Sequence, residues 1–309
     1  MRILCLGAGA IGGFFGARLI EGGADVTFLV RPNRQKALAE HGLRLESQFG
    51  NFNGPVKTVT GPAQGEAFDY IVLTCKAYDL ASAMAAIAPA VGHDTAIVPL
   101  LNGVAHIDLL NEKFGRDRVL GGVAKIAVTL TPEGTIKHLN DWRYITFGEQ
   151  SGGLSERVLA LKAVFDKSSA VAAAVPNIMQ IMWEKIVHLS TVAGMTCLMR
   201  ANLGEIARTR DGIELMLGFL ARNAEIAART GYAPSEAFMT EYRQLFSDKN
   251  SSYTASMLRD IEKRGPIEAD HIIGFMLDKA VALQLDPSLH RVVYTHLKSY
   301  EERRAANRF

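Results

Sequence analysis

The sequence predicts an α/β domain built on a parallel sheet, followed by an all-helical domain. In the first half, short apolar runs alternate with helical stretches, which is typical of a parallel sheet with helices on both faces. A glycine-rich segment at residues 7–12 joins the first apolar run to the first helical stretch. After Pro176 the strand-like runs disappear and apolar residues follow a helical period.

The elements of the first domain follow one another in a regular order. Apolar runs that end at glycine, proline or charged residues indicate strands, and longer amphipathic runs indicate helices. Pro132-Glu133-Gly134 is a turn between two of the strands. The sequence predicts strands at 3–6, 25–30, 70–74, 95–99, 119–129, 135–139, 144–147 and 170–175, helices at 10–20, 34–41, 80–90, 104–114 and 154–166, and β-type alternation over 43–60.

The second domain contains only helical patterns. We place the boundary at Pro176, so that residues 1–175 form the first domain and residues 176–309 the second. The sequence predicts helices at 177–199, 202–209, 211–230, 235–247, 252–264, 267–284 and 287–303.

Composition excludes several classes of protein. The formal net charge of +2 gives no strong field that would attract nucleic acid or an anionic membrane. No apolar run reaches the roughly 18 residues of a membrane span, so we expect a cytoplasmic protein. Cys5, Cys75 and Cys197 are far apart and form no CxxC pair. We therefore expect buried thiols in a reducing compartment, and neither a metal site nor a disulfide.

The glycine-rich segment Gly7-Ala8-Gly9-Ala10-Ile11-Gly12 matches G-x-G-x-x-G between a strand and a helix. Gly7 permits the tight turn, Gly9 lets a pyrophosphate approach the backbone, and Gly12 lets helix and strand pack closely. Ala10 and Ile11 open the helix, whose free N–H groups attract phosphates. This context predicts dinucleotide binding by a Rossmann-type, doubly wound sheet.

The end of the second strand indicates which dinucleotide is bound. An acidic residue there would bind the ribose 2′-hydroxyl of NAD, but this chain has Arg31 and Arg34, and Asp25 lies at the opposite end of the strand. Arginines at this place can form charge-assisted hydrogen bonds with a 2′-phosphate. The sequence therefore favours NADPH/NADP+, with the alternative that both arginines are solvated surface charges.

Two polar residues follow later strands of the same sheet. Lys76 comes after the strand at 70–74, and Asn102 follows the strand at 95–99. Because ligands bind at the carboxyl ends of parallel strands, we expect both side chains at the cofactor and substrate crevice.

The helix predicted after Pro176 carries a lysine within its apolar stripe. Lys185 lies four residues after Ile181 and four before Leu189. Burial would lower its pKa and make it a tunable proton donor. The alternative is a lysine that reaches solvent or pairs with a carboxylate such as Glu184 or Glu268.

These motifs appear in an order that resembles one family, the ketopantoate reductases (2-dehydropantoate 2-reductases), over essentially the full length of the chain. The matching pieces are GAGAIGG at 7–13, Arg31, Cys75-Lys76, Asn102-Gly103, Trp183-Glu184-Lys185, Ser256-Met257-Leu258-Arg259-Asp260, Glu268 and Gly274.

The resemblance implies a reaction and roles for its residues. The family reduces a 2-oxo acid to a 2-hydroxy acid with NADPH, in pantothenate and coenzyme A biosynthesis. Lys185 corresponds to the general acid, and Ser256 and Glu268 to substrate-site residues. We group Glu268 with Lys185 as catalytic. Lys76 and Asn102 correspond to residues that line the cofactor and substrate crevice.

The chain departs from the family at two positions. The family often has asparagines that contact substrate four and eight residues after the helix lysine, where this chain has Leu189 and Ala193. A polar substrate would lose two partners there, at about 1–3 kcal/mol each if its groups stay unpaired. A paralogue that reduces a less polar 2-oxo acid or ketone is therefore an alternative to a ketopantoate reductase.

Two further alternatives stay open. An NAD-dependent 2-hydroxy acid or opine-type dehydrogenase would need the acidic residue that the second strand lacks. A non-catalytic, NADP-binding redox sensor would keep the glycine segment but would not need Lys185, Ser256 and Glu268. We expect a small-molecule 2-oxo acid as partner, and the sequence leaves a homodimer open.

Overall fold

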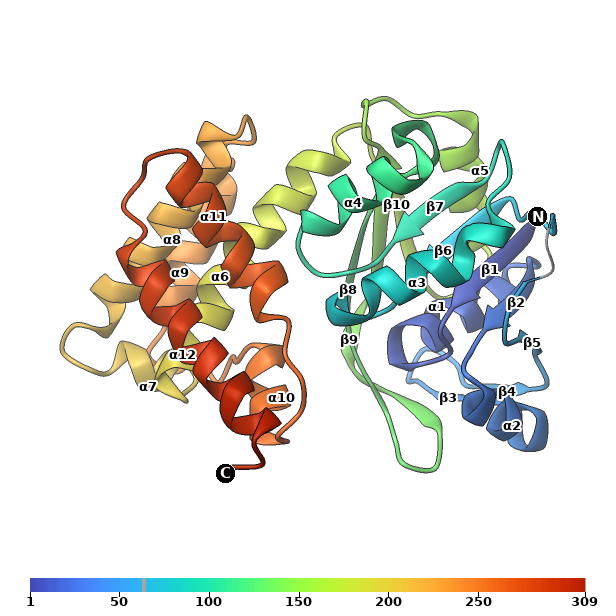
Figure 1. The fold of residues 1–309 in the computed structure, drawn as a ribbon, viewed down its shortest axis with the longest axis horizontal. Helices are drawn as coiled ribbons and strands as arrows, with labels where there is room; N and C mark the ends of the chain where they lie inside the picture. Colours follow the sequence, from blue (N-terminus) through green and yellow to red (C-terminus); the bar gives the residue numbers. More distant parts are fainter. Residues whose placement is uncertain (63–64, 309) are drawn as a thin grey trace. The chain divides into compact units, whose positions relative to one another are not determined.

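The computed structural model describes residues 1–62 and 65–308, which divide into two compact units. The first unit contains residues 1–101 and 106–178, and the second contains residues 102–105 and 179–309. Figure 1 labels the helices and strands of both units. In the part of the chain that the structure describes, no helix has the length and apolar character of a membrane span.

A parallel sheet forms the centre of the first unit. Its strand order is β5-β2-β1-β6-β7, and every neighbouring pair is parallel. The strands are β1 (Arg2–Leu6), β2 (Asp25–Leu29), β5 (Lys57–Val59), β6 (Tyr70–Leu73) and β7 (Ala96–Pro99). β2 and β6 flank β1, so the chain segments that leave these three strands emerge at one edge of the sheet.

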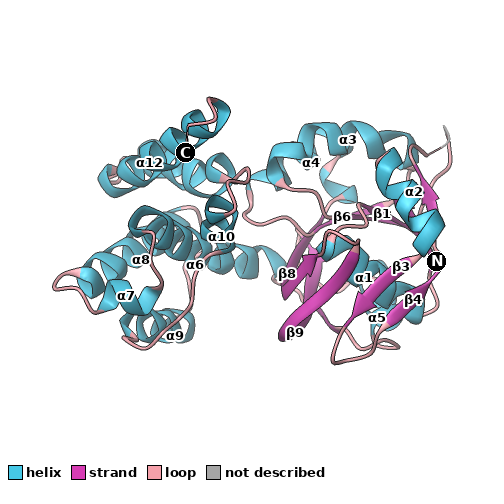
Figure 2. Ribbon diagram, turned by 90° about the horizontal axis from the view of Figure 1, so that it is seen from below, coloured by secondary structure: helices cyan, strands magenta, loops and turns pink. Residues whose placement is uncertain are grey.

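The first unit also contains a second sheet, which is mixed. Its strands are β3 (Leu43–Glu46), β4 (Phe52–Gly54), β8 (Leu120–Leu130), β9 (Thr135–Glu149) and β10 (Val171–Ala174). β9 pairs antiparallel with β8 along most of its length, and parallel with β3 near its start and β10 near its end. Figure 2 shows β8 and β9 as long neighbouring strands.

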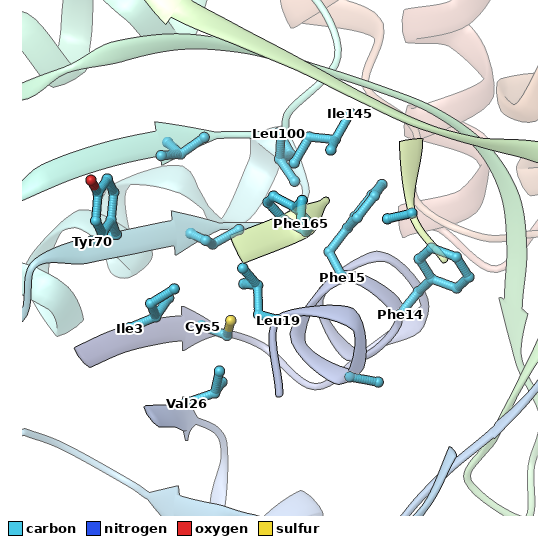
Figure 3. Close-up of a cluster of buried hydrophobic side chains, with 14 of the residues drawn as sticks. Ile3, Cys5, Phe14, Phe15, Leu19, Val26, Tyr70, Leu100, Ile145 and Phe165 are labelled. Carbon is cyan, nitrogen blue, oxygen red and sulfur yellow. The ribbon is translucent and has the colours of Figure 1, made fainter. Parts of the chain in front are cut away.

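The first helix, α1 (Ala10–Glu21), packs in the core that both sheets share. Phe14, Phe15 and Leu19 are fully buried there. Figure 3 shows Leu19 and Phe15 between Cys5 of β1 and Ile145 of β9, with Phe14 on the far side of Phe15. Glycines in α1 permit this close approach: a Cβ at Gly13 would come within 2.2 Å of Ile136, and one at Gly16 within 2.4 Å of Phe28.

The remaining helices of the first unit connect the strands. They are α2 (Pro32–His41), α3 (Leu80–Ile87), α4 (Ala105–Phe114) and α5 (Glu156–Phe165), with short 3-10 turns at Ala77–Asp79, Ala88–Ala90 and Arg116–Arg118. α2 begins with proline at its first position, where the missing N–H costs no hydrogen bond.

The second unit is helical. Its helices are α6 (Ile178–Met199), α7 (Leu203–Ala207), α8 (Gly212–Arg229), α9 (Glu236–Ser247), α10 (Ser256–Glu262), α11 (Phe275–Ala282) and α12 (Ser288–Ala305), and a π-helical turn at Asp270–Gly274 leads into α11.

A buried polar chain joins α6, α8 and α12. Nε2 of His290 lies 2.9 Å from Oδ1 of Asn223, whose Nδ2 donates to Oγ1 of Thr191 at 3.0 Å. Thr191 donates in turn to the carbonyl of Val187 at 2.7 Å. All three side chains are fully buried. Burial lowers the pKa of His290 to about 4, so it stays neutral and donates to Asn223. These hydrogen bonds hold α6 against α8 and α12.

The predicted α/β architecture with a helical second part is confirmed, but several details of the prediction were wrong. We expected a single sheet, and the structure has two. The strands expected at 135–139 and 144–147 form one continuous strand, β9. Oδ1 of Asn140 accepts from the backbone N–H groups of Ala127 and Trp142, at 3.2 Å each, beside a break in the β8–β9 register. The helix expected at 252–264 begins only at Ser256, and the one at 267–284 is preceded by the π-helical turn.

Candidate active site

The glycine segment has the geometry that the sequence predicts. Gly7 has φ +93°, a conformation that residues with a Cβ rarely adopt. A Cβ at Gly12 would lie 2.1 Å from the Gly7 carbonyl oxygen and 2.4 Å from Oγ1 of Thr74. Thr74 donates to the carbonyl of Leu6 at 2.7 Å, so it links β6 to the start of the segment. Glycine at position 12 is therefore required by packing.

The start of α1 offers room and donors for phosphate. Gly9 is the N-cap residue, without a side-chain cap, and the first turn contains no acidic residue. A Cβ at Gly9 would meet no atom within 4 Å, so the space above the backbone is open. The first N–H groups of a helix have no partner within the helix. The backbone of residues 9–12 therefore fits the pyrophosphate of a dinucleotide.

Arg31 and Arg34 differ in their surroundings. The Arg31 side chain is 80% exposed, and its Nη2 lies 3.1 Å from Oδ2 of Asp79. Arg34 is held within the first unit: its Nε donates to the carbonyl of Ala8 at 3.0 Å and its Nη1 to that of Gly134 at 3.3 Å. The exposed guanidinium of Arg31 is free to reorient toward a ligand. That of Arg34 is held by its hydrogen bond to the backbone of the glycine segment.

Lys76 lies where the sequence places it, just beyond the end of β6. It is exposed and precedes the 3-10 turn at Ala77–Asp79, where its carbonyl accepts from the N–H of Asp79 at 2.9 Å. Cys75, which we expected to be buried, is partly exposed because β6 ends at Leu73.

Lys185 and Glu268 interact within the helical unit. Burial lowers the pKa of Lys185 to about 8, and the negative charge of Glu268 opposes part of this shift. The Glu268 side chain is itself buried, with 9% exposure. A buried amine with a nearby carboxylate retains its proton at neutral pH and yet releases it more easily than an ordinary lysine.

Asn102 lies near the same helix. Residues 102–105 pack with the helical unit although they follow β7. Gly103 has φ +85°, and a Cβ there would lie 3.2 Å from the carbonyl oxygen of His271 and 3.6 Å from Ile186. Gly103, the residue next to Asn102, therefore lies close to Ile186, which follows Lys185 on α6.

Ser256 is the first residue of α10, which packs against a more distant part of α6. The N–H of Ala255 donates to Oγ1 of Thr196 at 3.4 Å. Thr196 lies 11 residues beyond Lys185, which corresponds to about 16 Å along the helix axis. The described contacts place Lys185, Glu268 and Asn102 in one neighbourhood, and they tie Ser256 to a later turn of α6.

Leu189 and Ala193 share a helical face with Lys185, because they follow it at intervals of four residues. Leu189 is half-buried, and Ala193 is 3% exposed. The face beyond the lysine is therefore apolar.

The sequence analysis missed two residues that interact with predicted site residues, one with Glu268 and one with Arg31. His271 interacts electrostatically with Glu268, and burial lowers its pKa. Asp79 reaches Arg31 from the 3-10 turn after β6. No motif announces either residue, although His271 lies in a π-helical turn, a feature frequent at functional sites. Within residues 1–62 and 65–308, no cluster of histidine, cysteine or carboxylate side chains could hold a metal ion.

Two family models match the chain. One, described as "Ketopantoate reductase PanE/ApbA", matches residues 3–152, and the other, "Ketopantoate reductase PanE/ApbA C terminal", matches residues 177–301. A curated relative from Bacillus subtilis, "Uncharacterized oxidoreductase YkpB", is 32% identical and covers 97% of this chain and 99% of its own.

Solved structures share the fold. That of 2-dehydropantoate 2-reductase from Methylococcus capsulatus is 28% identical, with a TM-score of 0.89, and covers 99% of this chain and 98% of its own. A D-mandelate dehydrogenase solved with NADH and anilino(oxo)acetate has a TM-score of 0.86 and 20% identity, and covers 99% of each chain. At that identity the second likeness concerns the fold alone.

We predict that Gly9→Ala keeps the fold and weakens dinucleotide binding. The added methyl group meets no protein atom within 4 Å but occupies the space for the pyrophosphate. Titration of nucleotide fluorescence should show affinity reduced by about tenfold or more, which corresponds to at least about 1.4 kcal/mol. Gly54→Ala is the control, since a Cβ there also meets nothing within 4 Å. Wild-type affinity in Gly9→Ala would contradict the phosphate site.

We also predict that Lys185→Met sharply lowers turnover and removes a pH-dependent penalty on the stability of the fold. Loss of a general acid lowers kcat by about 10²–10⁴-fold. Because the folded pKa of Lys185 lies below its ordinary value, the charged amine destabilises the fold at pH 7, and this penalty disappears as the pH rises from about 8 toward 10.5.

Calorimetry should therefore show that the Tm of the wild type rises relative to that of Lys185→Met as the pH is taken from 7 to 10. Lys167→Met, at an exposed position, is the control and should change neither Tm nor turnover. A difference in Tm between wild type and Lys185→Met that stays the same at pH 7 and pH 10 would contradict the lowered pKa of Lys185.

Proposed function

Because the chain belongs to the ketopantoate reductase family, whose members are oxidoreductases acting on CH–OH groups, we propose that it reduces a 2-oxo acid to a 2-hydroxy acid with NADPH. The first substrate we assign is 2-dehydropantoate, with pantoate as product. That assignment would give the protein a cytoplasmic role in pantothenate and coenzyme A biosynthesis. The observation that carries the proposal is the half-buried Lys185 beside Glu268, with a pKa that desolvation lowers to about 8.

Lys185 serves this reaction as both cation and proton donor. When bound, the reduced nicotinamide supplies the hydride to the carbonyl carbon. Negative charge then develops on the carbonyl oxygen, where the Lys185 ammonium stabilises it and donates one proton. The lysine is left as a neutral amine and takes its next proton from water. A pKa of about 8 suits this role, because most of the lysine is protonated at neutral pH.

Other residues orient the reactants. Glu268 keeps the neighbouring lysine charged, and Asn102, Ser256 and Lys76 are the side chains we assign to substrate, with Lys76 and Asn102 also assigned to the cofactor. The backbone at Gly7, Gly9, Ala10, Ile11 and Gly12 holds the pyrophosphate. Family members use a nicotinamide cofactor, and we assign NADPH because Arg31 stands where a 2′-phosphate would lie.

A second candidate is a paralogous reductase of a less polar 2-oxo acid or ketone. Leu189 and Ala193 favour it, since both are apolar on the face of α6 that carries Lys185. The curated relative from Bacillus subtilis is an oxidoreductase of uncharacterised substrate. A non-catalytic sensor is disfavoured, because the family consists of oxidoreductases.

NADPH oxidation over a panel of 2-oxo acids tests the proposal. The panel contains 2-dehydropantoate and analogues with alkyl and aromatic side chains, and absorbance at the nicotinamide band reports turnover. We expect oxidation with at least one 2-oxo acid. A preference for 2-dehydropantoate supports the first candidate, and a preference for an apolar analogue supports the second. No oxidation with any member would contradict reduction of 2-oxo acids.

The double variant Leu189→Asn/Ala193→Asn tests how α6 selects the substrate. We expect kcat/KM for 2-dehydropantoate, relative to an alkyl 2-oxo acid, to rise about tenfold, since each new hydrogen bond contributes about 0.5–1.5 kcal/mol. Leu198→Asn, on another face of α6, is the control. An unchanged ratio in the double variant would mean that this face does not contact the substrate.

A further inference from the structure

An ion pair joins two segments that leave neighbouring strands of the parallel sheet. Arg31 follows β2 and precedes α2, while Asp79 lies in the turn after β6. Nη2 of Arg31 and Oδ2 of Asp79 are 3.1 Å apart although the residues are 48 positions apart in sequence. Because β2 and β6 lie on either side of β1, the pair spans the edge of the sheet beyond the end of β1.

The Asp79 carboxylate is directed to Arg31 and not to its own helix. Asp79 is the N-cap residue of α3, where an aspartate usually accepts from a backbone N–H of the first turn. Its side chain makes no such cap hydrogen bond. The backbone at both positions is fixed, since Arg31 accepts from the N–H groups of Arg34 and Gln35, and Asp79 donates to the carbonyl of Lys76.

The pair is exposed enough to exchange partners. The side chains of Arg31 and Asp79 are 80% and 39% exposed, and an exposed ion pair contributes little to stability. In a doubly wound sheet the adenosine end of a dinucleotide lies at this edge. In this chain that place is between the segments that follow β2 and β6. Both charged groups would therefore meet the ribose.

The two groups prefer different ribose substituents. A 2′-phosphate pairs with the guanidinium of Arg31 but must displace Asp79 and then lie near its negative charge. A free 2′-hydroxyl can donate to the carboxylate of Asp79, the contact that an acidic residue makes in NAD-binding sites. The acidic residue that β2 lacks at its end is thus supplied by the turn after β6.

We propose that Asp79 sets the cofactor selectivity of this chain, weakening its preference for NADPH and allowing it to accept NADH as well. This inference rests on the proposed function for the place of the ribose. Asp79 acts in two ways. It competes with the 2′-phosphate for Arg31, and it accepts a hydrogen bond from the ribose 2′-hydroxyl when no phosphate is present.

Calorimetric binding of two adenosine fragments to the full chain tests the proposal without turnover. The probes are adenosine 2′,5′-bisphosphate and 5′-AMP, which differ only in the 2′-phosphate. We expect comparable affinities in the wild type, and in Asp79→Asn a shift of the affinity ratio toward the bisphosphate by about tenfold. Asp79→Ser should shift the ratio in the same direction.

Asp25→Asn is the matched control. Asp25 also forms an exposed ion pair, with Lys57 at 2.7 Å, and its loss changes the net charge equally. It lies at the opposite end of β2, about 20 Å from Arg31 along the strand direction, so the affinity ratio should not change.

Each outcome separates the two proposals. An unchanged ratio in both Asp79 variants, with both probes bound by the wild type, overturns the role of Asp79 and leaves the reductase proposal intact. A wild type that binds the bisphosphate at least a hundredfold more tightly than 5′-AMP also overturns it. A wild type that binds neither probe overturns the nucleotide site, and with it both proposals.

Discussion

The interaction of the half-buried Lys185 with Glu268 is the one on which the proposed chemistry of the helical unit depends. Removing an ammonium from water is costly, and the cost appears here as a pKa lowered to about 8. The partner carboxylate, itself buried, offsets part of it. On the same helix, hydrogen bonds among the buried side chains of Thr191, Asn223 and His290 join α6 to α8 and α12.

The nucleotide end of the first unit depends on close approach of backbone and not on buried charge. Gly7 and Gly12 let the segment turn tightly between β1 and α1, and Thr74 ties it to β6. Arg34 supports the same segment through the carbonyl of Ala8. A Cβ at Gly9 would meet no atom within 4 Å, so the space above the segment is open. Arg31 and Asp79, which follow β2 and β6, form an exposed ion pair at the same edge of the sheet.

Local features were predictable from sequence because a few adjacent residues determine them. The glycine segment, the strand and helix that flank it, and the lysine within the stripe of α6 are examples. Long-range pairings were not predictable. β3 pairs with β9 across about ninety residues and joins the second sheet, and β9 runs without interruption through Asn140, where we expected a gap between two strands. Asp79 meets Arg31 only after β2 and β6 have taken their places beside β1, and residues 102–105 pack with the helical unit although they follow a strand.

The pH dependence of kcat/KM for 2-oxo acid reduction by the wild-type chain tests the central claim most directly. If the Lys185 ammonium donates the proton, the rate must fall as the pH rises through an apparent pKa of about 8, because the deprotonated amine has no proton to give. The fall should be absent from the residual rate of Lys185→Arg, whose guanidinium keeps its proton throughout this range. A wild-type profile that stays level to pH 10 would contradict the assignment of Lys185 as the general acid.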